Sequence, residues 1–389
     1  MHPFLRIINR FLTLILVAAG IGVGSLYFLK VQFDKPGPLE TAKVVVIPQG
    51  RGVSAIGEQL ENEGVIADRR IFVTTSLYFN YLKDNSTLKA GEYEFEPGTS
   101  MRDVLDKLVE GKSIRHKVTV AEGLTSQQVV RKLLDHPELT GEITEIPPEG
   151  SLLPDTYLFR RGESREDILK RMAQAQQVFM AEHWKNRASD LPIDTPQEAL
   201  ILASIVEKET GVDEERPQIA AVFENRLKKG MRLQSDPTII YGLVGGEGKL
   251  GRRILQSELD KKTVYNTYQI DGLPPTPIAN PGRSAILATL NPAETDALYF
   301  VANGTGGHAF AASLTDHNEN VAAWRRIQRQ REKEEEEREA QEGAASTDEP
   351  GVDGDAEAGL AASAGIPAEG GGDGQPPLPK RNPKLDAAP

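Results

Sequence analysis

The hydrophobic residues of this chain are unevenly spaced, and their spacing predicts a long apolar helix, short strands alternating with amphipathic helices, and a polar tail. The apolar run at residues 11–29 contains no charged residue and is long enough to cross a bilayer as a helix. Because Arg6 and Arg10 precede it, we predict that residues 1–10 are cytoplasmic and that everything after the run lies outside. The alternative is a cleaved signal peptide that ends near Val17-Ala18-Ala19.

Beyond a polar linker at residues 30–42, one small pattern occurs three times: a strand, a glycine turn, a polar cap and a short helix. The strands are expected at residues 44–47, 92–95 and 117–120, and the helices at 53–61, 101–110 and 127–134. These units predict a small α/β module over residues 43–135. Two functions fit such a module: glycan binding of the LysM kind, or a scaffold that positions the next domain.

The most sharply bounded element is a helix between Thr195 and Gly211. Thr195 and Glu198 have the spacing of a capping box, in which each side chain bonds to the other residue's backbone amide. Pro196 stands at the first helical position, where its missing amide proton costs nothing. We expect Gly211 to adopt the left-handed conformation that ends many helices.

Two glutamates near the end of this helix, Glu207 and Glu209, are candidates for acid–base catalysis. At about 100° per residue they point about 200° apart. Glu209 follows the helical spacing of the apolar residues Leu202, Ile205 and Val206, whereas Glu207 falls on a smaller, more polar face. A carboxyl group against apolar neighbours has a raised pKa, which a general acid near neutral pH requires. Two solvated glutamates at a helix end are the simpler alternative.

A larger domain is predicted at residues 136–330. Helices are expected at 163–185 and 213–229, and 151–159 reads as a loop. Between residues 231 and 310 we expect short strands, one of them buried at 298–301, and polar, aromatic loops whose prolines and glycines suit a rigid binding cleft. Residues 331–389 are predicted as a charged, low-complexity, disordered tail, entered through a charged helix at 316–338.

Composition narrows the possible chemistry. The net charge of −12 argues against nucleic-acid binding, and the absence of cysteine excludes disulfides, thiolate metal sites and a cysteine nucleophile. The histidines form no HExxH pair, and the chain has neither a GxSxG elbow nor a Walker A loop. We therefore expect no metal and no cofactor, which leaves carboxylate chemistry in a polar cleft. Four residues from the loops after the glutamate helix are our candidates for substrate contacts: Asp236, Tyr265, Asn266 and Asn280.

Six motifs in chain order carry a family resemblance. They are Leu202 to Thr210 (LASIVEKET), Phe223 to Leu227 (FENRL), Gly230 to Thr238 (GMRLQSDPT), Tyr265 to Tyr268 (YNTY), Gly272 to Pro275 (GLPP) and Gly306 to Phe310 (GGHAF). Together they are similar to the endolytic murein transglycosylases, the YceG-like family, and the resemblance covers residues 11–327. It implies an α+β fold with a transmembrane helix, a LysM-like module and a mixed α/β catalytic domain. It also implies that Glu209 is the catalytic residue.

The resemblance further implies a lyase of the bacterial inner membrane whose catalytic domain is periplasmic. Such an enzyme cuts the β-1,4 bond between N-acetylmuramic acid and N-acetylglucosamine in nascent glycan strands. It leaves a 1,6-anhydro end, which would terminate strand elongation. The expected partners are peptidoglycan strands and cell-wall synthases. The alternatives are a non-enzymatic peptidoglycan-binding scaffold for the synthases and a muramidase that hydrolyses the same bond.

Overall fold

The computed structural model describes residues 3–82 and 87–345, which form two compact units. The N-terminal unit contains residues up to 118 together with 133–142 and 156–168. Of the described residues, the C-terminal unit contains 119–132, 143–155 and 169–345. The chain therefore passes between the units several times, whereas our expectation placed a single boundary between residues 135 and 136.

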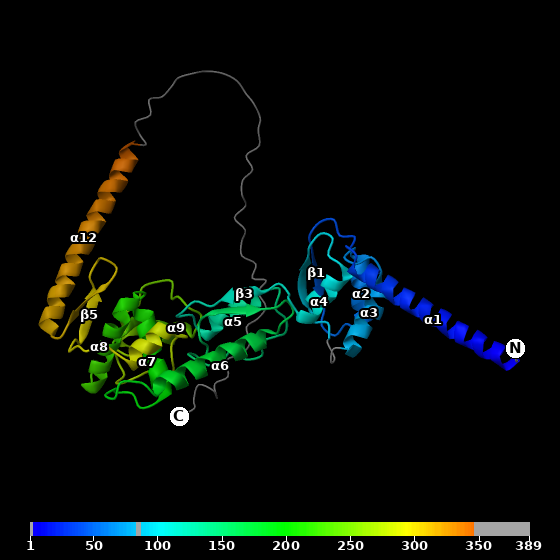
Figure 1. Cartoon of the computed structure of the whole chain (residues 1–389). Coiled ribbons are helices and arrows are strands. Elements are labelled where there is room, and N and C mark those ends of the chain that lie inside the picture. Colours follow the sequence, from blue (N-terminus) through cyan, green and yellow to red (C-terminus); the bar gives the residue numbers. More distant parts are fainter. Residues whose placement is uncertain (1–2, 83–86, 346–389) are drawn as a thin grey trace, which may run out of the picture. The chain divides into compact units, whose positions relative to one another are not determined.

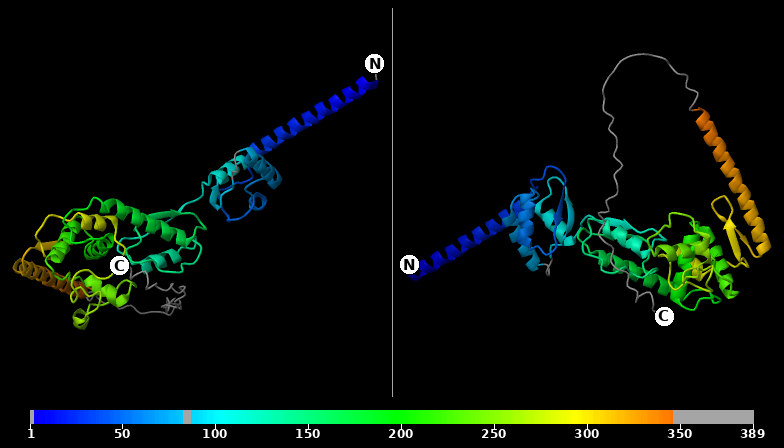
Figure 2. Two further views of the ribbon diagram at one scale, coloured as in Figure 1. Left: turned by 90° about the horizontal axis from the view of Figure 1, so that it is seen from below. Right: turned by 180° about the vertical axis from the view of Figure 1, so that it is seen from behind.

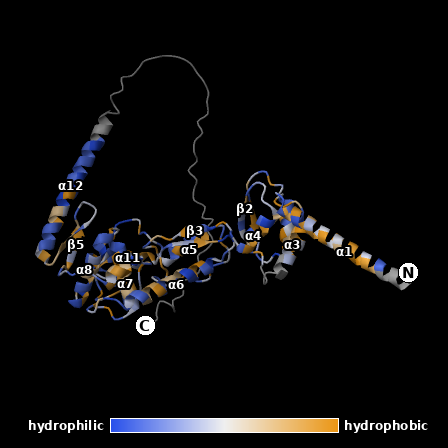
Figure 3. Ribbon diagram, in the orientation of Figure 1, coloured by the Kyte–Doolittle hydropathy of each residue, from blue (hydrophilic) through white to orange (hydrophobic). Residues whose placement is uncertain are grey.

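Helix α1 (Pro3–Asp34) begins the N-terminal unit and runs out from its folded part in every view (Figures 1 and 2). Its segment Asn9–Asp34 is long and apolar enough to cross a membrane, and it is hydrophobic along most of its length (Figure 3). From Asn9 onward, the one buried residue of α1 is Phe33, which is 1% exposed and belongs to the core of the unit. The exposed apolar part of α1 thus continues directly into a folded module.

The module of the N-terminal unit is a two-stranded antiparallel sheet covered by helices. Strands β1 (Lys43–Ile47) and β2 (Gly91–Phe95) pair with Val45 opposite Tyr93, and both side chains are fully buried. Helices α2 (Val53–Asn62), α3 (Arg69–Leu82) and α4 (Met101–Glu110) complete it. The predicted strand and helix positions are thus confirmed to within one residue for these two repeats, whereas α3 was not predicted.

The third repeat does not join this sheet. Strand β3 (His116–Thr119) instead pairs with β4 (Thr156–Phe159), which we had expected to be part of a loop. His116 stacks on Phe159 with ring centroids 5.6 Å apart, and the Phe159 side chain is buried. The apolar residues of 151–159 therefore include a strand whose partner lies about forty residues earlier in the sequence.

The C-terminal unit is mainly helical and is built around α7 (Pro196–Glu209). The other elements that belong to it, wholly or in part, are α5 (Ser126–Leu134), α6 (Arg165–Trp184), η1 (Asp213–Glu215), α8 (Arg216–Lys228), α9 (Asp236–Val244), α10 (Gln256–Asp260), α11 (Arg283–Leu290), β5 (Tyr299–Ala302), β6 (His308–Ala311) and α12 (Leu314–Ala345). Leu202, Ile205 and Val206 of α7 are fully buried in the core, where α8 and α11 pack against this helix.

Three expectations for this unit were wrong. The region 231–310 contains helices α9, α10 and α11 where we expected short strands and loops. The strand at 298–301 exists as β5, but its residues are only partly buried; it forms a two-stranded hairpin with β6 (register Phe300 to Phe310). Gly211 has no left-handed backbone; α7 ends instead at Thr210, whose backbone is extended (φ −140°).

Helix α12 is longer than the charged helix that we predicted. It continues to Ala345, so residues 331–345 are helical although they belong to the segment that we expected to be disordered. Its first part packs on the β5–β6 hairpin, and its later part is strongly hydrophilic (Figure 3). The rest of the predicted tail, residues 346–389, lies outside the described residues.

Candidate functional site

The start of α7 is fixed by the predicted capping box. Thr195 Oγ1 accepts a hydrogen bond from the backbone amide of Glu198 at 3.2 Å, and Glu198 Oε2 accepts one from the amide of Thr195 at 3.0 Å. Pro196 occupies the first turn. Most of the helix after its first turn is buried in the core. The positions of Glu207 and Glu209 in its last turn are therefore fixed.

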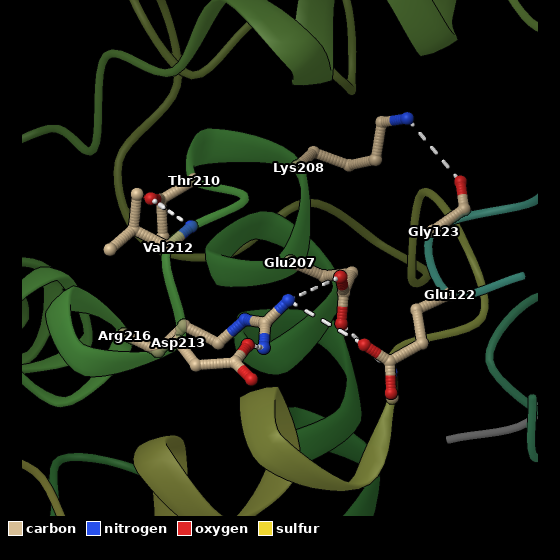
Figure 4. A network of polar contacts seen from close by, with 9 residues as sticks. Glu122, Gly123, Glu207, Lys208, Thr210, Val212, Asp213 and Arg216 are labelled. Carbon is tan, nitrogen blue, oxygen red and sulfur yellow. Dashed lines mark hydrogen bonds and ion pairs between the residues drawn. The ribbon is translucent and has the colours of Figure 1, made fainter. Parts of the chain in front are cut away.

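Glu207 belongs to an ion-pair network (Figure 4). Its Oε1 lies 3.1 Å from Nη2 of Arg216, and its Oε2 accepts the amide of Gly282 at 2.9 Å. Both the Glu207 and the Arg216 side chains are only 5% exposed, and Glu122 and Asp213 complete the network. Burial raises the pKa of Glu207, although the Gly282 amide and the Arg216 charge oppose this. Glu207 therefore connects α7, α8 and the start of α11, which is a structural role.

Glu209 has a different environment. Its side chain is partly buried at the end of α7, and Ser235 Oγ donates a hydrogen bond to its Oε1 at 2.5 Å. Burial raises the pKa of Glu209 to about 7, because loss of solvation outweighs the Ser235 hydrogen bond. The negative charge of Asp236 raises this pKa further, and the positive charges of His308 and Arg226 lower it. A carboxyl group in this environment can both give and take a proton near neutral pH.

The backbone around Ser235 is held by a second short segment. Ser235 N donates to Thr267 Oγ1 at 2.9 Å, and the amide of Gln234 donates to the carbonyl of Thr267 at 3.1 Å. Gln234 has a φ of 53°, which is unusual for a residue other than glycine. This conformation changes the direction of the backbone just before Ser235. The hydroxyl that faces Glu209 is therefore positioned by the YNTY segment and not by α7.

Three more polar side chains interact electrostatically with Glu209: Asp236 and Tyr268, from the same two segments, and Arg226, from α8. Asp236, the first residue of α9, accepts a hydrogen bond from the hydroxyl of Tyr268 at 2.7 Å. Burial and the Asp236 carboxylate raise the pKa of Tyr268, so that its hydroxyl stays protonated and donating. Arg226 is 7% exposed and donates to the carbonyls of Leu233 and Leu298 at 2.6 and 2.7 Å.

A histidine–carboxylate pair completes the site. Nδ1 of His308, on β6, lies 2.7 Å from Oε2 of Glu215, and Glu215 Oε1 accepts the amide of His308 at 2.8 Å. Partial burial disfavours ionisation of Glu215, but these contacts outweigh it and lower its pKa. The pair fixes the imidazole close enough to Glu209 to lower the pKa of that carboxyl.

The structure brings together only part of the predicted set of substrate contacts. Asp236 lies beside the glutamate, as described above. Tyr265 packs against the core in a T-shaped contact with Tyr241, with the two ring centroids 5.0 Å apart, and its hydroxyl lies 2.8 Å from Thr276 Oγ1.

Asn266 and Asn280 have structural contacts instead. Asn266 is 1% exposed, and its amide nitrogen donates to three backbone carbonyls, of Glu258, Leu259 and Lys261. Asn280 is fully buried and bonds to the backbone of Leu124 and Leu152. Because their polar atoms are already engaged with the protein, we remove both from the candidate contacts.

Sequence reasoning missed Ser235, Tyr268 and Arg226; it noted His308 as a loop histidine that could touch substrate but missed its pairing with Glu215. Ser235 and Tyr268 lie within the quoted motifs, so their presence was visible while their contacts were not. Glu215 and His308 are 93 residues apart, and no local pattern links them. Among the residues that the structure describes, no cluster of three or more histidine or acidic side chains could hold a metal ion.

The sequence of this chain is similar to known proteins over most of its length. The model of the YceG-like family matches residues 45–323. An endolytic murein transglycosylase of Bacillus subtilis is 33% identical over 316 residues, which is 72% of this chain and 84% of the relative. Another from Streptococcus pneumoniae is 29% identical over 82% of this chain, which spans 65% of that relative's length. A crystal structure of a YceG-like protein from Listeria monocytogenes covers 72% of this chain and 98% of its own, with 34% identity and a TM-score of 0.45.

Proposed function

This chain belongs to the YceG-like family, and on that premise we propose that it is a lytic transglycosylase, a lyase that cuts murein glycan strands with Glu209 as its single catalytic acid and base. The observation that carries this proposal is the environment of Glu209: burial raises its pKa to about 7, and Ser235 fixes one of its oxygens. Glu207, the competing candidate, is already committed to Arg216 and Gly282.

The proposed reaction uses one carboxyl group twice. Protonated Glu209 gives its proton to the oxygen that bridges N-acetylmuramic acid and N-acetylglucosamine, and the bond from C1 of the muramic acid to that oxygen breaks. The carboxylate then takes the proton of the C6 hydroxyl of the same muramic acid, whose oxygen closes on C1. The products are a 1,6-anhydro end and a free O4 hydroxyl, and no water is consumed. The internal nucleophile is already in place, which supplies part of the rate.

The neighbours of Glu209 have supporting roles in this scheme. We propose that Asp236 stabilises the positive charge that develops at C1; its charge also raises the pKa of Glu209, which favours the protonated acid before the first step. Tyr268 holds Asp236 through its hydroxyl. His308, oriented by Glu215, opposes Asp236 and keeps the pKa of Glu209 from rising too far for the second step.

The remaining parts of the chain suggest where the enzyme works. We propose that α1 anchors it in the inner membrane with the N-terminus cytoplasmic and the chain after α1 periplasmic, since Arg6 and Arg10 precede the apolar segment. The β1–β2 module would serve as a LysM-like glycan-binding element. Close to the membrane, cleavage within nascent strands would terminate their elongation and bring the enzyme near the cell-wall synthases.

The experiment that tests this function uses the purified full-length chain and uncross-linked glycan strands. Cleavage inside the strands shortens the whole length distribution early, whereas attack from the ends releases single disaccharides first. We expect the former from the wild type and no cleavage from Glu209→Gln. Release of disaccharides from the ends, or cleavage by Glu209→Gln at the wild-type rate, would contradict the proposal.

A further inference from the structure

The apolar segment of α1 continues directly into the folded part of the N-terminal unit. Residues 11–29 contain no charged side chain, and Lys30 is the first one that follows them. At about 1.5 Å per residue this run matches the ~30 Å hydrocarbon core of a bilayer, which places the bilayer surface close to Lys30. The helix continues without a break to Asp34, although we predicted a linker from residue 30. The bilayer surface therefore lies next to the folded part, with no flexible linker between them.

The burial of α1 begins within the apolar run itself. Residues 9–28 are exposed, whereas Leu29 and Gln32 are partly buried and Phe33 is 1% exposed. These three side chains lie on one face of the helix, because Gln32 and Phe33 are three and four residues beyond Leu29. Helices α3 and α4 both contact α1, and Figures 1 and 2 show the folded part at this end of it. The two helices therefore lie close to the level at which the apolar run ends.

The joint between α1 and the folded part is rigid. Arg102, on α4, forms an ion pair with Asp34 and lies over the ring of Phe33, with its Cζ 5.4 Å from the ring centroid. Phe33 also shares a buried core with Phe72 of α3. The orientation of α3 relative to the apolar segment is therefore fixed both by packing and by charge.

One face of α3 is exposed and carries two adjacent large apolar side chains. Phe72 is fully buried and defines the face toward the core. On the opposite side, the exposed residues follow helical spacing and are Arg70, Thr74, Leu77 and Tyr78. Leu77 is 54% exposed and Tyr78 is 58% exposed. Single exposed apolar residues are ordinary on a protein surface, but this pair belongs to a helix that contacts the end of a candidate membrane span.

The side chains of this face suit the boundary between lipid and water. Tyrosine is enriched at that boundary, because its ring is apolar and its hydroxyl is polar. Tyr27 and Phe28, near the end of the apolar run, are 70% and 58% exposed and supply two further rings close to this level. Leu77 can insert beside Tyr78, and the guanidinium of Arg70 can pair with lipid phosphates. An apolar helix face with a basic residue at its edge is typical of helices that lie in the plane of the interface.

We propose that the exposed face of α3 lies in the membrane interface, with Leu77 and Tyr78 inserted among the lipid headgroups beside α1. This proposal rests on the proposed anchoring of the chain by α1. The bilayer is the occupant of the face, because the contact of α3 with α1 brings α3 to the bilayer surface whichever other molecules are present. Held by α1 and by α3, the N-terminal unit keeps one orientation on the membrane. The β1–β2 sheet is then held at a constant height above the lipid.

The test uses the full-length chain, which contains no cysteine, so that a single introduced cysteine carries a nitroxide label at one chosen position. The labelled chains are reconstituted into vesicles of phosphatidylethanolamine and phosphatidylglycerol. Spin-relaxation measurements compare collisions with oxygen, which concentrates in lipid, and with a water-soluble nickel chelate. We expect the oxygen-to-nickel ratio to be severalfold higher at Leu77→Cys and Tyr78→Cys than at Val46→Cys. Val46, on β1, is the matched control, because it is an apolar residue of the same unit and is 40% exposed.

Two further labels separate anchoring by α1 from the contact made by α3. Leu16→Cys, within the apolar run, should give the highest ratio, and a water-like ratio there would contradict the anchoring and with it the proposal. Thr74→Cys reports on the exposed face of α3 while Leu77 and Tyr78 are still present. Replacing both of them by serine should lower the ratio at Thr74 to that at Val46. The melting temperature in detergent should not change, because both side chains are exposed.

Three results would overturn the proposal. The first is a water-like ratio at Leu77 and Tyr78 while the Leu16 label is in lipid. The second is a ratio at Val46 as high as that at Leu77, and the third is a ratio at Thr74 that the two serines leave unchanged. The first result would leave both the anchoring by α1 and the chemistry of Glu209 standing.

Discussion

The hydroxyl of Ser235 donates a hydrogen bond to Oε1 of Glu209 at 2.5 Å, although the two residues are 26 positions apart in the sequence. The two residues are held by different elements, α7 and the segment that pairs with Thr267, so their contact depends on the fold of the whole unit. Because a donated hydrogen bond favours the ionised carboxylate, Ser235 limits how far burial can raise the pKa of Glu209. Burial and the Ser235 hydrogen bond therefore shift the pKa of Glu209 in opposite directions.

The first prediction concerns Ser235→Ala. Without the donor, the pKa of Glu209 rises, and the alkaline limb of the pH–rate profile moves to higher pH. The carboxylate is also less well oriented for the second proton transfer, so we expect kcat to fall by about tenfold. Ser313→Ala, which removes a hydroxyl bonded to Asp316 at the start of α12, is the control and should leave the profile unchanged. An unchanged profile for Ser235→Ala would show that this contact does not act on the catalytic group.

Substitutions of two neighbours of Glu209 should shift its pKa in opposite directions. Asp236→Asn removes a negative charge that raises the pKa of Glu209, so the alkaline limb should move to lower pH. His308→Gln removes a positive charge that lowers this pKa, so the limb should move to higher pH. Rate profiles of both variants on one glycan substrate measure the two shifts. Shifts in the same direction would be incompatible with our assignment of charges around the glutamate.

The raised pKa of Glu209 also predicts a pH dependence of stability. The folded chain holds the proton up to about pH 7, whereas the unfolded chain releases it near pH 4.5. The folded state therefore loses stability as the pH rises from about 4.5 to 7, by up to about 3 kcal/mol at full burial. Glu209→Gln cannot ionise, so it should match the wild type at pH 4 and be the more stable protein at pH 8.

Urea unfolding followed by the fluorescence of Trp184, which packs against the core of the same unit, measures this difference. Equal stability of the two proteins at pH 8 would mean that the carboxyl group is well solvated in the folded state. The account of Glu209 as a buried acid would then fail.

Glu207→Gln should be less stable than the wild type, whereas Glu209→Gln should be more stable at pH 8. The loss of Glu207 leaves the buried Arg216 with a weaker set of partners, so we expect the free energy of unfolding to fall by about 1–3 kcal/mol. Because Glu207 has no part in the proposed chemistry, the pH–rate profile of the folded variant should keep its shape. A variant of Glu207 that is stable but inactive would make Glu207 the catalytic acid.

Local sequence signals predicted the elements that depend only on their own residues. The capping box of Thr195 and Glu198, and the one that Ser100 forms with Asp103 at the start of α4, show why α7 and α4 begin where predicted. The contrast between Glu207 and Glu209 followed from helical periodicity, although the sequence did not show that Arg216 would be the partner of Glu207. Helix α9 was missed because residues 231–310 were interpreted as short strands and loops, whereas Pro237, in the first helical turn, is also a start signal.

Features that depend on distant partners were not accessible in this way. The pairing of β3 with β4 and the contact of His308 with Glu215 join segments between which no periodic pattern runs. The same holds for Asn266 and Asn280: their residue type suited sugar hydroxyls, but the fold uses their amides to hold loops. An asparagine in a polar loop has the same sequence signature in both roles.

The central claim is that one carboxyl group breaks the glycosidic bond without water, and the most direct measurement follows the oxygen at the newly formed end. Glycan strands are digested by the wild-type chain in water enriched in the heavy oxygen isotope, and the new muramic acid ends are weighed by mass spectrometry. We predict ends one water lighter than a hydrolysed end, without heavy oxygen, and none of them from Glu209→Gln. Reducing ends that carry the heavy isotope would show hydrolysis and contradict the account.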